Sequence, residues 1–300
     1  MTRGSRSWRA IVLGVPGVWL LVLGLAPLLI ALAISFGTPT EGAPPYDAPI
    51  AWTDAGLRIA PALTSYAQIF EDDLYLVAFL TSLRIAAAAT AICLLIGYPM
   101  ALAIARAPEA RRPALLLLVM LPFWTSFLVR VYAWITLLRP TGIINTALIG
   151  AGVISEPLPL YANEFAVHLG IVYSYLPFMV LPLYVAIERV DPALLAAAAD
   201  LGARPATVLW RILVPLTLPG MIAGAALVFI PAAGEFVIPD LLGGSDNVMI
   251  GRVLWNEFFS NRDWPAASAI AVALLVLLVA PVVIAQRAAQ RPAQEEERGT

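Results

Sequence analysis

The chain contains no lysine, because all 18 of its basic residues are arginine. The phosphate-binding loop of P-loop ATPases requires a lysine, so this chain cannot hold that kind of ATP site. Schiff-base chemistry through a lysine amine is excluded for the same reason. If ATP drives this protein, another polypeptide must bind and hydrolyse it.

Histidine and cysteine are nearly absent, since His168 and Cys93 are the only residues of their kinds. An intrachain disulfide and a metal site built from several thiolates are therefore excluded. A zinc site with two histidines or a Ser–His–Asp hydrolase is hard to build, and the chain lacks the G-x-S-x-G turn of the α/β-hydrolases. We expect no enzyme activity, no cofactor and no metal site in this chain.

Charge is also scarce: only 13% of the residues are charged, while 61% are hydrophobic and the mean hydropathy is +0.86. Soluble domains are about 25% charged. The apolar residues come in continuous runs of about 20 or more, the length that crosses the hydrocarbon core of a membrane. An outer-membrane barrel would instead alternate apolar and polar residues. The sequence therefore predicts an all-α integral membrane protein that crosses the bilayer several times.

Six apolar runs predict six transmembrane helices. They are expected at about Ile11–Phe36, Leu80–Ala105, Ala114–Leu138, Phe165–Ile187, Pro219–Leu241 and Ala266–Gln286. Arginine is concentrated in the N-terminus, the second-to-third loop, the fourth-to-fifth loop and the tail, whereas the long first loop is acidic. By the positive-inside rule, both termini are expected in the cytoplasm.

This topology divides the chain into four parts. We expect a cytoplasmic N-terminus with the first helix (1–36), an extracytoplasmic loop (37–79), a core of five helices (80–286) and a cytoplasmic tail (287–300).

Proline interrupts the third, fourth and fifth predicted helices. The residues are Pro122, Pro177, Pro182, Pro231 and Pro239. Each removes a backbone hydrogen bond and kinks its helix. Such a break is tolerated in lipid only where protein or a cavity satisfies the backbone. The prolines therefore fit either ordinary helix packing or a bundle curved around a pathway.

Two charged residues fall inside predicted helices, Arg130 in the third and Glu235 in the fifth. Intramembrane charges usually face the bundle interior and pair with something. An Arg130–Glu235 ion pair is one interpretation. In the other, Glu235 and the nearby Asp240 line a passage for a cationic solute.

Aromatic residues gather around the third predicted helix. Those that could contact an ammonium group by cation–π attraction are Trp124, Tyr132 and Trp134. Aromatics at such positions are more often interface anchors or packing residues.

The cytoplasmic loop 188–218 has a structure of its own. Asp191 and Pro192 form a helix start, with aspartate as N-cap and proline at the first helical position. The alanine-rich run Ala193–Ala199 has very high helix propensity, and Gly202 permits a sharp turn after it. A helix–break–helix of this kind could seat in a partner protein or lie on lipid headgroups.

The same loop resembles the coupling loop of ABC importer permeases. That pattern reads EAA, three residues, G, nine residues, then I-x-L-P. Ala197 and Ala198 precede Gly202 at the right spacing, and Ile212 and Pro215 follow at theirs. The resemblance implies that Asp200, Leu201 and Ala203, beside Gly202, also belong to the ATPase-coupling surface. Two departures are Ala196 in place of the motif glutamate and Val214 in place of its leucine.

The resemblance extends over roughly Leu80–Pro281. Within this range the sequence is similar to the first permease subunit of spermidine/putrescine importers. The segments that carry it are Leu121–Trp134, Tyr173–Tyr184, Leu227–Gly244, Met249–Gly251 and Arg262–Pro265. Permeases for iron, opines and aminophosphonates belong to the same wider group.

The resemblance implies the type I importer fold, in which an N-terminal helix wraps a core of five. It also implies a multi-pass protein of the bacterial inner membrane, surrounded by lipid, without a nucleic-acid partner. A second related permease, two ABC ATPase subunits that carry ATP and Mg, and an extracytoplasmic solute-binding protein would complete the machine. The competing hypothesis is an ion-driven secondary transporter that works alone.

Overall fold

The computed structural model describes residues 4–53, 56–244 and 247–280. It divides into two compact units. Unit 1 comprises Met1–Leu76 with Val253–Thr300, and unit 2 comprises Val77–Arg252. Apart from two short hairpins, the regular structure of the described residues is helical, which confirms the predicted class.

Unit 1 begins with α1 (Gly4–Ile34), which covers most of the first predicted helix. Its stretch from Val12 to Ile34 is apolar enough to cross a membrane, and none of its most hydrophobic window is buried within the chain. Apolar surface of this extent requires lipid or another protein around it.

The loop that follows α1 in unit 1 contains two antiparallel hairpins that the sequence did not predict. The strands are β1 (Thr38–Pro39) with β2 (Tyr46–Asp47), and β3 (Ile50–Thr53) with β4 (Gly56–Ile59). The helix α2 (Thr64–Glu71) follows them. Ser35 and the Tyr66 hydroxyl hydrogen-bond at 2.8 Å and so tie α2 to the end of α1.

The C-terminal part of unit 1 is held by a polar and an aromatic contact. The Tyr75 hydroxyl donates to the buried Glu257 carboxylate at 3.1 Å. The Trp264 ring stacks on Phe258 with 5.0 Å between centroids. Trp264 begins an apolar helix that is described as far as Ala280, so the remainder of the sixth predicted helix lies outside the described residues.

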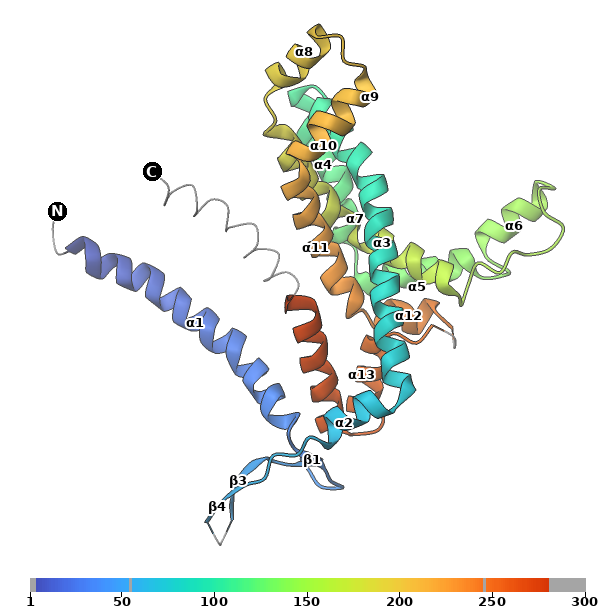
Figure 1. Cartoon of the computed structure of the whole chain (residues 1–300). Coiled ribbons are helices and arrows are strands. Elements are labelled where there is room, and N and C mark those ends of the chain that lie inside the picture. The colour runs from blue at the N-terminus through green and yellow to red at the C-terminus, as the bar shows by residue number, and fades with distance from the viewer. Residues whose placement is uncertain (1–3, 54–55, 245–246, 281–300) are drawn as a thin grey trace. The chain divides into compact units, whose positions relative to one another are not determined.

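Unit 2 is built around α7 (Glu164–Glu188) and α11 (Leu218–Ala233), which pack together along their lengths (Figure 1). Small residues permit the close approach. A Cβ atom at Gly220 would collide with the Cβ of Ala186, and one at Gly224 would lie 2.8 Å from the Met179 sulfur.

The long helix α3 (Asp73–Arg106) ends in unit 2, and it and α7 match the second and fourth predicted helices. Gly97 of α3 faces Met179 of α7, where an added Cβ would lie 3.0 Å from the Met179 Cγ. α7 therefore contacts α3 and α11 through the same methionine.

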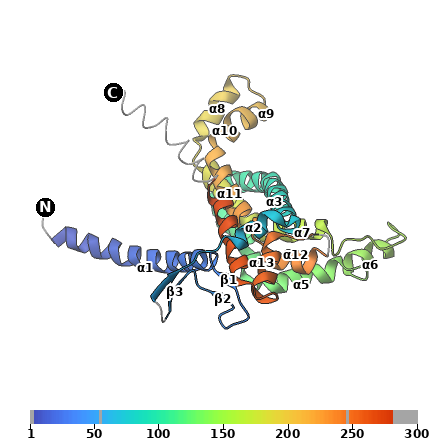
Figure 2. The same cartoon turned by 60° about the horizontal axis from the view of Figure 1, so that its bottom comes forward.

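The third predicted helix, Ala114–Leu138, is wrong as a single element. The chain forms three short pieces there, with a fourth before them and a fifth after them. They are η1 (Glu109–Arg111), α4 (Arg112–Met120), the 3₁₀ turn η2 (Leu121–Trp124), α5 (Phe127–Leu138) and α6 (Ile143–Gly150). Pro122 has no N–H to donate to the preceding turn, and Thr125 and Ser126 are extended. Figures 1 and 2 show α6 projecting away from α7 and α11.

The fifth predicted helix, Pro219–Leu241, is also interrupted. α11 ends at Ala233, and α12 (Val237–Leu242) begins after a break. At its other end, α11 is bent by 67° from the preceding helical segment Pro205–Leu216. The described residues contain four helices long and apolar enough to span a membrane, or five if the bent pair counts as one.

Candidate functional site

The predicted coupling loop forms a compact helical tip at one end of unit 2, past the ends of α7 and α11 (Figures 1 and 2). Its first helix is α8 (Pro192–Asp200). The Asp191 carboxylate accepts a hydrogen bond from the backbone N–H of Ala193 at 2.8 Å. This confirms the N-cap and the helix start that the sequence predicted.

The end of α8 is a Schellman motif centred on Gly202. The N–H of Ala203 donates to the Ala198 carbonyl at 3.0 Å, and the N–H of Gly202 donates to the Ala199 carbonyl at 2.9 Å. Gly202 has φ of +81°, a conformation that glycine adopts without steric cost. The glycine of the motif is therefore required by the backbone itself.

The tip presents apolar side chains to its surroundings. Leu201 is 89% exposed and Trp210 is 68% exposed. Ala197 and Asp200 are exposed as well, whereas Ala198 is half-buried. Large hydrophobic side chains this exposed are what an interaction surface presents.

The second half of the loop is held in a π-helical turn. α9 (Pro205–Val208) leads into η3 (Leu209–Leu213) and then α10 (Val214–Leu216). The N–H of Val214 donates to the carbonyl of Leu209, five residues earlier, which is the π-helical pattern. The next residue, Pro215, has no N–H and therefore cannot form the α-helical bond to the carbonyl four residues earlier. Ile212 lies half-buried within this turn and Pro215 is exposed.

Both ends of the loop are tied to the rest of unit 2. At the first end, the Glu188 carboxylate accepts from Arg112 at 3.2 Å and from the Tyr184 hydroxyl at 2.8 Å. At the second end, buried Thr217 hydrogen-bonds the Tyr98 hydroxyl of α3 at 3.1 Å. The tip is thus connected to the spans by polar contacts at its two bases.

Glu235 lies in the break between α11 and α12 and is 9% exposed. One carboxylate oxygen accepts from the Tyr175 hydroxyl of α7 at 2.5 Å. The other accepts from the backbone N–H groups of Phe236 at 3.2 Å and Val237 at 3.0 Å. The carboxylate therefore satisfies the backbone donors that the break exposes, and it is held in one orientation.

Arg130 does not pair with Glu235, so that interpretation is wrong. Its guanidinium donates to the Pro122 carbonyl and lies 5.4 Å and 5.7 Å from the ring centroids of Phe123 and Phe127. Its buried Nε atom has no hydrogen-bond partner among the described residues. Arg130 thus stabilises the break at Pro122 and the two rings beside it.

Asp240 forms an ion pair that the sequence did not predict. Its carboxylate lies 3.0 Å from the Arg252 Nε, and Arg252 also donates to the Gly244 carbonyl at 3.0 Å. Arg252 belongs to α13 (Ile250–Phe259).

The aromatic candidates are not gathered in one place with Glu235. Trp134 packs edge-on against Tyr173 of α7, with 5.4 Å between ring centroids. Trp124 is 78% exposed, and Tyr132 is exposed as well. Tyr175, the partner of Glu235, was missed by the sequence analysis, although a tyrosine two residues before Pro177 in an apolar helix was a visible signal.

Within the described residues, no group of three or more histidine, cysteine, aspartate or glutamate residues is placed to hold a metal ion.

Residues 94–292 match the family described as binding-protein-dependent transport system inner membrane component. The chain is 43% identical over 270 residues to the spermidine/putrescine transport system permease protein PotB of Haemophilus influenzae, covering 90% of each. It is 38% identical over 272 residues to PotB of Escherichia coli, covering 91% of this chain and 94% of that protein. A bacterial alginate ABC transporter, crystallised with an alginate-bound periplasmic protein, aligns over 96% of both chains with a TM-score of 0.66 and 17% identity.

Proposed function

Because the chain belongs to the family of binding-protein-dependent transport system inner membrane components, we propose that it is the permease of an ATP-driven importer of spermidine and putrescine. The observation that carries the polyamine assignment is the 43% identity to a spermidine/putrescine permease over 90% of both chains. The solved alginate transporter supports the fold of an ABC importer permease.

In this proposal the chain has six transmembrane helices and cytoplasmic termini. The distribution of arginine supports that orientation, and the helix beginning at Trp264 would supply the last crossing. A second related permease, two ATPase subunits that hold ATP and Mg, and an extracytoplasmic solute-binding protein complete the assembly. The lack of lysine supports the placement of ATP hydrolysis on the partner subunits.

The helical tip is the contact with an ATPase subunit. Leu201 is exposed on the chain by itself, so a partner can cover it without disturbing the packing of unit 2. The Schellman end at Gly202 fixes the direction of the tip. The chain runs from α7 into the tip and from the tip into α11, and the two bases are hydrogen-bonded to α4 and α3, so motion of an ATPase subunit reaches these four helices.

Transport proceeds by alternating access. ATP must bind more tightly to one conformation than to the other, and this difference drives the permease between inward-facing and outward-facing states. The solute pathway includes the region of Glu235, where a passing ammonium group would compete with the Tyr175 hydroxyl for the carboxylate. The remaining pathway candidates are Trp124, Arg130, Tyr132, Trp134 and Asp240.

Reconstitution tests this proposal. The chain and its co-purified partners are placed in ATP-loaded proteoliposomes, and uptake of labelled spermidine is measured with the binding protein outside. We expect uptake that requires enclosed ATP and Mg and that unlabelled putrescine inhibits. Uptake by the chain alone under a proton or sodium gradient would refute the ATP-driven mechanism. Inhibition only by ferric iron, an opine or an aminophosphonate would refute the polyamine assignment.

A further inference from the structure

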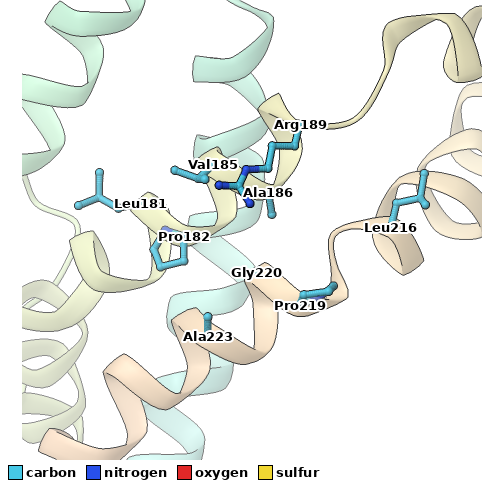
Figure 3. A pocket seen from close by; sticks show the side chains of 9 residues that line it. All are labelled: Leu181, Pro182, Val185, Ala186, Arg189, Leu216, Pro219, Gly220 and Ala223. Carbon is cyan, nitrogen blue, oxygen red and sulfur yellow. The ribbon is translucent and has the colours of Figure 1, made fainter. Parts of the chain in front are cut away.

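A groove of about 570 Å³ lies between the last turns of α7 and the start of α11 (Figure 3). Its walls are apolar. Leu181 and Val185 line it from α7, and Leu216 and Ala223 line it from α10 and α11. The groove therefore offers a surface suited to hydrocarbon.

The groove lies at the end of the packed pair of α7 and α11, where the chain turns away from α7. At this end Gly220 lies so close to α7 that an added Cβ atom would collide with Ala186. Beyond it, the 67° bend carries Leu216 aside, as Figure 3 shows. Helices that diverge in this way leave a space that must be filled, because an empty apolar space forfeits packing contacts.

Arg189 is the one charged residue lining this groove. In Figure 3 its side chain reaches back along α7 toward Val185 and Ala186. The two acidic residues nearest to it in sequence are engaged elsewhere: Glu188 by Arg112 and Tyr184, and Asp191 by the N–H of Ala193. Among the described residues, Arg189 forms no ion pair.

We propose that this groove binds one anionic phospholipid of the cytoplasmic leaflet. The lipid phosphate lies on the Arg189 guanidinium, and an acyl chain lies along Leu181, Val185, Leu216 and Ala223. A guanidinium matches a phosphate with two parallel hydrogen bonds, and basic pockets between helices on the cytoplasmic side suit anionic headgroups. The groove also adjoins the arginine-bearing loop 188–218, and the choice of leaflet rests on the orientation proposed above, in which this loop is cytoplasmic.

Lipid titration with a matched pair of variants tests the site. The delipidated transporter complex is titrated with phosphatidylglycerol, phosphatidylcholine or soluble glycerol phosphate, and bound molecules are counted by native mass spectrometry. We expect preferential binding of phosphatidylglycerol, weakened about fivefold by Arg189→Gln. Arg111→Gln removes another exposed arginine that lies outside the groove and should change the affinity less than twofold. Ala223→Trp fills the groove and should weaken both lipids.

Several results would overturn the proposal. Equal affinities for the two lipids, or equal losses in the two arginine variants, would remove the role of Arg189. Displacement of the lipid by glycerol phosphate alone would remove the role of the acyl chain. If phosphatidylglycerol bound to the isolated chain but not to the complex, the groove would be a surface that the second permease covers. Circular dichroism of each variant checks that the helices are intact.

Discussion

Substitutions of Gly202 distinguish the effect of the backbone conformation of the coupling loop on transport from the effect of its contacts. A Cβ atom at this position meets no other atom within 4 Å, so alanine, asparagine and valine all find open space in this chain. The cost comes from the backbone alone, because φ is +81°. It should be about 1–2 kcal/mol for alanine, less for asparagine, which tolerates this conformation, and more for branched valine.

This cost falls on the end of α8, and hydrogen exchange measures it there. At about 1.4 kcal/mol per factor of ten, the amide of Ala203 should exchange about tenfold faster in Gly202→Ala than in the original chain. ATP-driven uptake is measured on the same variants in proteoliposomes. We expect near-normal uptake for asparagine, a reduction for alanine and abolition for valine, with normal membrane insertion in all three.

The two measurements together distinguish a structural role of Gly202 from a direct contact with a partner. If uptake falls as the exchange rate rises across the variants, the stability of the end of α8 limits coupling. If asparagine leaves exchange nearly unchanged yet abolishes uptake, a partner contacts position 202 directly. Normal uptake in the valine variant would refute the coupling role of this loop.

Two further predictions concern the tip and the break in the fifth helix. Leu201→Asp should leave the helix content unchanged, since the side chain is 89% exposed, but should abolish uptake and co-purification of the ATPase subunits; retained co-purification would contradict this. Glu235→Gln should lower spermidine uptake because the amide carries no charge, whereas Tyr175→Phe keeps the carboxylate and should retain uptake. Equal uptake in all three proteins, with the complex intact, would leave Glu235 with a structural role only.

The coupling tip was predictable because its signals are local. An aspartate cap, a proline at the first helical position, an alanine run and a glycine stop all lie within about one dozen residues. The structure has α8 where these signals place it, from Pro192 to Asp200, with Asp191 as its cap.

The breaks in the membrane helices were not predictable in the same way. A hydropathy profile identifies apolar segments, but it does not show whether the backbone remains helical through them. Proline marked the region near Leu121–Trp124, but a kink and a full interruption have the same sequence signature. The break after Ala233 depends on Glu235 and on Tyr175, which lies 60 residues earlier in the chain.

The pairing of the intramembrane charges failed for a related reason. Opposite charges in two apolar helices suggested an ion pair, but several other groups could satisfy each of them. Arg130 donates to a carbonyl group at the break near Pro122, and Glu235 accepts from backbone N–H groups at the break between α11 and α12. The local interruptions therefore decided the partners, and the sequence did not reveal where those interruptions fall.

The bend at Thr217 gives the fifth helix the geometry of a lever. α11 has 16 residues, so its length is about 24 Å, and a rotation of about 10° at the bend would move its far end by about 4 Å. Glu235 lies just past that far end, and its bond to Tyr175 is only 2.5 Å long. A swing of α11 relative to α7 would therefore part these two side chains, so a push on the helical tip would release the Glu235 carboxylate at the opposite end of α11.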